Sequence, residues 1–302
     1  MELNLNPSMR RFPAFAFCVA ALVLPSLAVA QERLRDQIYL KEGGAAFTLD
    51  VFKPKNPNGG AVIWFVSGGW FSKHEDINDG LALALNQTGL TVIQVVHGSQ
   101  PRYIIPEIVS QVRRAVRFVR TNAASYGIDE KRIAVSGASA GGHLSLMVAG
   151  LGDDGNPNAK DPVERASSRV AAAAVFFPPT DFVNYGAKGN MPADGSDPKM
   201  TPFLPAFGPI KGLTPDQLKA KAAELSPITN VKKGFPSVLL IHGDKDSLVP
   251  LQQSEIFDKA VGEVGSVHQL IVIPGGGHDP STVLPGLPRM VAWLIQQIGR
   301  AK

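Results

Sequence analysis

Cysteine, long apolar runs and blocks of like charge are all scarce in this sequence. Its 302 residues include one cysteine, Cys18, and that residue lies in an N-terminal segment that we expect to be removed. The mature chain would then form no disulfide and use no thiol in catalysis. The formal net charge is only +4 and no block of lysine and arginine accompanies it, so we expect no nucleic acid partner. No internal repeat occurs, which argues against a propeller domain.

The one long apolar run lies near the N-terminus and predicts an export signal. Arg10-Arg11 precede apolar residues 12–30, which end in Ala28-Val29-Ala30. A positive start, an apolar middle and small residues at the end are typical of a secretory signal peptide. A retained membrane anchor is the competing interpretation, but two prolines in the run and the polar residues after it favour cleavage.

We therefore expect residues 1–30 to be a signal peptide and residues 31–302 to form one exported domain. The mature protein would be periplasmic or secreted by a bacterium, with no stable insertion in the membrane after cleavage. A composition of 44% hydrophobic and 19% charged residues is ordinary for a globular domain of this size.

Short apolar runs alternate with helix-compatible runs along the rest of the chain. Two short strands around Gly43-Gly44, at 37–40 and 46–52, predict an antiparallel hairpin at a sheet edge. Further strands are predicted at 61–66, 91–96, 132–136, 171–177, 237–241 and 269–273, and helices at 79–88, 106–126, 142–149, 251–261 and 285–299. This alternation predicts an α/β fold with a mostly parallel central sheet and helices on both faces.

Two stretches interrupt this simple pattern. Residues 178–236 hold many prolines and glycines and one clear helix at 214–225, which is too much chain for a plain connection and predicts a small cap or lid insertion. The predicted helix 106–126 has valines and isoleucines on one face and arginines on the other. A solvated helix face explains these arginines better than a phosphate site: Arg113, Arg114, Arg117 and Arg120.

The strand at 132–136 and the helix at 142–149 are joined by Gly137-Ala138-Ser139-Ala140-Gly141. A strand, a tight turn and a helix are the setting of the G-x-S-x-G nucleophile elbow. The serine there adopts a strained backbone conformation that raises its hydroxyl above the sheet, and flanking side chains would clash. We therefore predict that Ser139 is a nucleophile; the alternative is an ordinary strand-to-helix turn.

A serine hydroxyl needs a base to activate it, and the base needs an acid to orient it. In this architecture the acid follows a late strand and the histidine follows the last one. His278, after three glycines, is the predicted base. Two aspartates compete for the third role: we favour Asp246, which lies further along the loop, and expect Asp244 to brace the turn.

The other histidines have weaker claims. His74 and His97 follow strands and would be able to line the cleft, whereas His143 is expected to pack beneath Ser139. His242 ends a strand and is interpreted as structural.

An oxyanion hole completes the predicted site. Ala140, directly after the nucleophile, supplies one backbone N–H. The second comes from the loop Ser67-Gly68-Gly69-Trp70, most directly from Gly69 and alternatively from Trp70. Trp70 would otherwise form one wall of the substrate cleft.

These motifs together resemble the α/β-hydrolase superfamily, in its esterase/lipase branch. Residues 137–144 are similar to the elbow of hormone-sensitive-lipase-like esterases and of the bacterial feruloyl/acetyl-esterase-like group. Residues 67–70 resemble their His-Gly-Gly-Gly motif, with serine for histidine and tryptophan after two glycines. The resemblance implies an α/β-hydrolase fold and a serine carboxylester hydrolase that forms an acyl-enzyme, with no cofactor and no metal.

The expected substrate is a small-molecule or polysaccharide ester, either short-chain or carbohydrate-linked. Two other functions stay open. A serine peptidase of the prolyl-oligopeptidase type shares the elbow and the order of the triad, but such enzymes usually carry a propeller. A non-catalytic binding protein on the same fold would be expected to lack a triad residue, and this sequence lacks none.

Overall fold

A computed structural model describes residues 32–299 of the chain. The predicted signal peptide lies outside the described residues. Among those residues we find no helix that combines the length and the apolar character needed to cross a bilayer.

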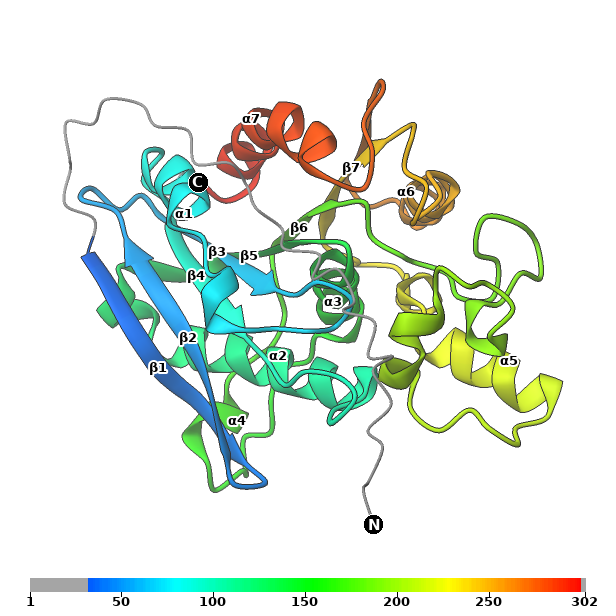
Figure 1. Ribbon diagram of the computed structural model, residues 1–302. Helices are drawn as coiled ribbons and strands as arrows, with labels where there is room; N and C mark the ends of the chain where they lie inside the picture. Colours follow the sequence, from blue (N-terminus) through cyan, green and yellow to red (C-terminus); the bar gives the residue numbers. More distant parts are fainter. Residues whose placement is uncertain (1–31, 300–302) are drawn as a thin grey trace, which may run out of the picture.

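One eight-stranded sheet organises the described chain (Figure 1). Its strand order is β1-β2-β4-β3-β5-β6-β7-β8. The N-terminal hairpin pairs antiparallel, and β2 joins β4 antiparallel, while all pairs from β4 to β8 are parallel. The strands are β1 Glu32–Glu42, β2 Ala45–Lys53, β3 Gly59–Val66, β4 Thr91–Val96, β5 Ile128–Ala138, β6 Ala172–Phe176, β7 Ser237–Gly243 and β8 His268–Ile273. The predicted fold class, an α/β-hydrolase fold with a mostly parallel sheet, is confirmed.

Helices cover both faces of the sheet, and each face has its own apolar core. The helices α2 Ile105–Thr121, α3 Ala140–Leu151 and α6 Gln252–Glu263 pack into one core, and α1 Asp79–Asn86 and α7 Pro280–Ile298 pack into the other. Strand β3 shows the alternation: Ile63 and Phe65 enter the first core, whereas Val62 enters the second and Trp64 packs against it. A continuous apolar run is what a strand covered on both faces requires.

Most predicted elements are present, with shifted ends. Helix α1 is capped by Asn78, whose side chain accepts the Leu81 N–H, and not by Asp79 as its sequence position suggests. Helix α3 runs past Gly150 to Leu151, since this glycine packs against Asn230 and does not leave the helical conformation. Helix α7 begins at Pro280 because the Asp279 side chain caps it, five residues before the predicted start.

The prediction that the arginines of α2 form a solvated helix face is wrong in part. Arg117 is only 7% exposed and pairs with Asp153 and Glu164. Arg114 pairs with Asp161 and Glu164. The acidic partners belong to the loop that follows α3 and to the short helix α4 Pro162–Arg165. The arginines therefore bind that polar loop and α4 onto α2. Hydropathy along a single helix cannot show this, because the partners are 36 to 50 residues away.

The insertion between β6 and β7 lies to one side of the sheet, around the helix α5 Pro215–Glu224 (Figure 1). It also contains three short 3₁₀ segments, of which Thr201–Phe207 matters most for the site. Buried aromatic residues of this insertion, Phe182 and Phe207, pack against Trp70 in the loop after β3. This contact places the insertion over the carboxyl ends of the strands.

Candidate active site

Ser139 lies at the sharp turn between β5 and α3, at the carboxyl edge of the sheet. Its φ of 53° and ψ of −120° are unusual for a residue with a side chain. The flanking glycines are needed because of close backbone approach: a Cβ on Gly141 would lie 2.5 Å from the Phe65 carbonyl oxygen, and one on Gly137 would lie 2.5 Å from the Gly141 carbonyl carbon. The turn thus holds the strain that exposes the serine hydroxyl.

His278 reaches this hydroxyl from the loop after β8. The distance from His278 Nε2 to Ser139 Oγ is 2.8 Å, and that from His278 Nδ1 to Asp246 Oδ2 is 2.7 Å. Because a carboxylate only accepts, Nδ1 carries the proton and Nε2 is free to accept the serine O–H. The structure therefore brings together the three predicted residues in the geometry of a serine, a base and an orienting acid.

The Asp246 side chain is fully buried and heavily hydrogen-bonded, whereas Asp244 is exposed. Asp246 Oδ1 accepts the N–H groups of Leu248 and Val249, and Oδ2 faces both His278 and His242. Burial would raise the pKa of Asp246, but the hydrogen bonds from the two histidines and from Val249 outweigh it and hold the pKa well below its ordinary value. The carboxyl is therefore ionised at neutral pH.

Asp244 instead joins the two loops that carry the acid and the base. Its Oδ1 accepts the Gly275 N–H at 2.7 Å, and the Lys245 N–H donates to the Gly276 carbonyl at 2.8 Å. The backbones meet so closely that a Cβ on Gly243 would lie 2.1 Å from the Gly276 oxygen. This packing fixes the distance between Asp246 and His278.

The loop after β3 presents two unpaired backbone N–H groups. Within residues 32–299, the N–H groups of Gly69 and Trp70 have no hydrogen-bond partner, and neither does that of Ala140 at the first position of α3. Gly69 and Trp70 both have positive φ, 57° and 62°. Free N–H groups on the turn beside a helix N-terminus are the donors that an oxyanion hole needs.

The Trp70 side chain lies inside the protein and does not form a cleft wall. The residue is 2% exposed, and its indole N–H donates to His143 Nδ1 at 3.3 Å. His143 Nε2 lies 2.8 Å from the Leu225 carbonyl, so it carries the imidazole proton. Burial lowers the pKa of His143 to about 4, although the Leu225 carbonyl acts in the opposite direction. As predicted, His143 packs in the core beneath the nucleophile turn.

A sequence model of the BD-FAE family matches residues 49–261, which is more than half of the chain. The chain belongs to the BD-FAE family. It is a member of the α/β-hydrolase superfamily, in the esterase branch that the motifs resemble.

Relatives of this BD-FAE domain carry esterase names. The chain is 32% identical over 207 residues to the esterase LipQ of Mycobacterium tuberculosis, covering 68% of this chain and 46% of LipQ. It is 25% identical over 254 residues to the isoprenylcysteine alpha-carbonyl methylesterase of Arabidopsis thaliana, covering 76% of this chain and 53% of the relative. The chain therefore spans about half the length of the curated relatives that it matches.

Solved structures resemble the domain over almost its whole length. A truncated carbohydrate esterase from gut microbiota superposes with a TM-score of 0.73 and 25% identity, covering 89% of this chain and 97% of the other. An acetyl ester-xyloside bifunctional hydrolase from Caldicellulosiruptor lactoaceticus superposes with a TM-score of 0.71 and 26% identity, covering 88% and 93% of the two chains.

Two side chains near the BD-FAE site escaped the sequence prediction. Phe177, just after β6, has a φ of 36°, and its ring lies 4.4 Å from the imidazole of His278. Gln100, in the loop after β4, is buried and donates to the Gly69 carbonyl. Neither belongs to a motif, and the signal for Gln100 is only that a polar residue follows a buried strand at the same sheet edge.

The two histidines suggested for the cleft each bond a group outside the predicted triad. His74 contacts Thr48 of the edge hairpin at 2.6 Å, and His97 is buried with Nδ1 against the Gly98 carbonyl. His242 bonds Ser254 and the Val249 carbonyl behind Asp246, which agrees with its structural interpretation. Among residues 32–299, no group of three or more histidine, cysteine or acidic side chains is arranged to hold a metal ion.

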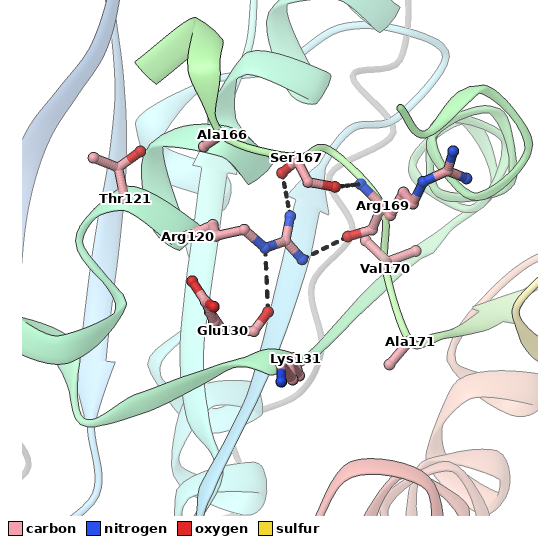
Figure 2. Close-up of a pocket in the computed structure, with 9 residues that line it drawn as sticks. All are labelled: Arg120, Thr121, Glu130, Lys131, Ala166, Ser167, Arg169, Val170 and Ala171. Carbon is pink, nitrogen blue, oxygen red and sulfur yellow. Dashed lines mark hydrogen bonds between the residues drawn. The ribbon is translucent and has the colours of Figure 1, made fainter. Parts of the chain in front are cut away.

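A cavity of about 620 Å³ lies near the start of β5, whereas Ser139 follows the end of that strand. Its lining comes from the end of α2, the start of β5 and the chain just before β6 (Figure 2). Arg120 crosses it and donates to the backbone carbonyls of Glu130, Ser167 and Arg169 (Figure 2). The guanidinium is therefore occupied in holding the loop before β6, and this cavity is separate from the catalytic candidates.

Proposed function

We propose that the protein is a serine carboxylester hydrolase. The observation that carries the proposal is the pair of contacts at His278, 2.8 Å to the Ser139 hydroxyl and 2.7 Å to the Asp246 carboxylate. An ionised carboxylate stabilises the imidazolium that forms when the base takes the serine proton. Membership of the BD-FAE family and the esterase names of the relatives support the same reaction.

The reaction follows from the roles that the geometry allows. Ser139 Oγ attacks the ester carbonyl carbon while its proton moves to His278 Nε2, and the carbonyl oxygen becomes an oxyanion. The N–H groups of Gly69, Trp70 and Ala140 stabilise that charge. His278 then protonates the leaving alcohol, and a water molecule that His278 deprotonates cleaves the acyl-enzyme.

We further propose a short acyl group on a carbohydrate-linked ester as the substrate. The cap contributes Phe203, whose ring lies so close to Gly69 that a Cβ there would meet it at 2.4 Å. A ring packed on this loop leaves little room beside it and favours a small acyl group. The structural relatives described as a carbohydrate esterase and an acetyl ester-xyloside hydrolase support the carbohydrate part.

Replacement of the nucleophile tests the reaction. We expect Ser139→Ala to abolish hydrolysis of p-nitrophenyl acetate and labelling by a fluorophosphonate probe. The matched control is Ser125→Ala, which removes an exposed hydroxyl that donates to the Asn122 carbonyl. Activity of Ser139→Ala within tenfold of the wild type would reject the assignment.

Two further assays separate the alternatives. Wild-type protein that takes up no fluorophosphonate would indicate a binding protein, and faster cleavage of a peptide amide than of an ester would indicate a peptidase. A chain-length series of p-nitrophenyl esters, run beside acetylated xylan, tests the substrate. Preference for long acyl chains would overturn the short-acyl proposal.

We also propose that the protein is exported, on the strength of the N-terminal pattern from Arg10 to Ala30. N-terminal sequencing of the protein from the periplasm or medium of a bacterial host tests this. A mature terminus near Gln31 is expected, and an intact N-terminus in the membrane fraction would contradict it.

A further inference from the structure

One buried side chain holds the loop that carries the oxyanion donors. Gln100 is 3% exposed and follows β4, which neighbours β3 in the sheet. Its backbone N–H donates to the Trp70 carbonyl at 3.2 Å, and its side-chain Nε2 donates to the Gly69 carbonyl at 2.8 Å. Two successive carbonyls of the loop are therefore held by the same residue.

The second of these bonds sets the direction of an N–H group. The Gly69 carbonyl and the Trp70 N–H belong to one peptide unit, and in a planar trans peptide the two groups point in opposite directions. When Gln100 holds the carbonyl on one side, the Trp70 N–H points to the other. That N–H is one of the groups without a partner in the described part of the chain.

The same amide group also contacts the cap. Gln100 Nε2 lies 3.3 Å from the carbonyl oxygen of Pro202, in the 3₁₀ segment Thr201–Phe207. The next residue, Phe203, is the one whose ring packs against Gly69. The position of the cap and the orientation of the Gly69–Trp70 peptide are thus linked through a single NH₂ group with two protons to donate.

We infer that Gln100 is a positioning residue for ester hydrolysis. It orients the Trp70 N–H toward the developing oxyanion, and this orientation depends on the contact between Gln100 and the cap at Pro202. The inference rests on the proposed function. Gln100 itself touches no reacting atom, so its effect is expected on the transition state, in which the oxyanion forms, more than on substrate binding.

The test is Gln100→Glu, which keeps the shape of the side chain and replaces its NH₂ by an acceptor oxygen. A carboxylate facing the Gly69 and Pro202 carbonyls repels both, so the peptide turns away. Removal of a whole oxyanion donor lowers kcat about 10²- to 10³-fold. A donor that is present but wrongly oriented should cost less, so we expect kcat to fall about 10- to 100-fold, with KM within about threefold of the wild type.

Acidification gives a readout that a general loss of stability does not. Burial beside carbonyls favours the protonated form of the introduced Glu, which can donate its O–H to Gly69. The ratio of kcat in Gln100→Glu to kcat in the wild type should therefore rise as the pH falls from 8 to 5.5. Using the ratio cancels the pH effects on catalysis that both proteins share.

Two more variants complete the design. Gln296→Glu adds the same charge on the exposed face of α7 and should match the wild type at every pH. Gln100→Met removes the donor without adding a charge, so its kcat should fall without recovery at low pH. If Gln100→Glu does not fold, the loss of kcat in Gln100→Met decides the question.

The possible failures can be told apart. Wild-type protein without ester hydrolysis that depends on Ser139 overturns the proposed function and this inference with it. Normal Ser139-dependent hydrolysis, with kcat of both Gln100 variants within twofold of the wild type, overturns the inference alone. A kcat ratio that does not change with pH, or a loss confined to KM, overturns it as well.

Discussion

The buried imidazole of His143 should make the stability of the protein depend on pH between about 4 and 6.5. This ring has no exposed surface, accepts from the Trp70 indole and faces the Leu225 carbonyl. Burial lowers its pKa from the ordinary 6.5 to about 4. The unfolded chain then binds a proton in this pH range that the folded protein does not, so stability rises with pH through it and is lost as the pH falls.

The magnitude follows from the two pKa values. With 6.5 in the unfolded chain and about 4 in the folded protein, the linkage relation makes the free energy of unfolding about 2 kcal/mol lower at pH 5 than at pH 7.5 for this one group. His97 is a second such case, because burial also lowers its pKa to about 4 against a smaller opposing effect of the Gly98 carbonyl. Together the two histidines account for about 4 kcal/mol over the same interval.

Urea unfolding of His143→Gln at pH 7.5, 6.5, 5.5 and 5.0 tests this. Glutamine keeps one acceptor and one donor near Trp70 and Leu225 but does not titrate. The variant has its own stability at pH 7.5, and only the change with pH is compared. The wild type should lose about 2 kcal/mol more than His143→Gln between pH 7.5 and 5, and His97→Gln should behave alike. Equal pH dependence in the wild type and His143→Gln would refute the reasoning.

Three further predictions concern the site. Asp246→Asn should lower kcat/KM on p-nitrophenyl acetate by about 10⁴, because the imidazolium loses its partner; Asp244→Asn should lose less than tenfold, and the reverse order would reassign the acid. Gly141→Ala should abolish fluorophosphonate labelling and lower Tm, since its Cβ would lie 2.5 Å from the Phe65 carbonyl oxygen; full labelling would contradict this. Phe203→Ala should shift the optimum in a p-nitrophenyl ester series to longer acyl chains, and an unchanged optimum would exclude Phe203 as a limit on acyl length.

Local patterns were enough to predict the central sheet. The continuous apolar run at 61–66 indicated a strand covered on both faces, which β3 is, and the strand predicted at 91–96 is β4. The glycines around Ser139 indicated a turn that only residues without side chains can flank, and their contacts explain it. Ends were predicted less well: α7 begins five residues before its predicted start, because Asp279 caps it through a side-chain bond that propensity does not specify.

Partners distant in the chain were beyond the reach of such patterns. The arginines of α2 look like a solvated face until the loop after α3 supplies Asp153 and the helix α4 supplies Glu164. The choice between Asp244 and Asp246 needed the position of each carboxyl group in the folded turn. The Asp244 carboxylate accepts the Gly275 N–H, whereas the Asp246 carboxylate accepts from His278. Gln100 belongs to no motif, and the two partners of its side chain lie 31 and 102 residues away.

By itself, the order of residues determined which segments become strands and helices, because burial periodicity and turn chemistry are encoded over a few neighbouring positions. It also placed a hydroxyl, a carboxylate and an imidazole after strands that end at one edge. Only the folded chain decided how these groups meet: which aspartate faces the ring, which N–H groups stay unpaired, and which amide holds the Gly69 carbonyl. Hydrogen bonds act over about 3 Å, so they depend on packing between segments that local sequence does not bring together.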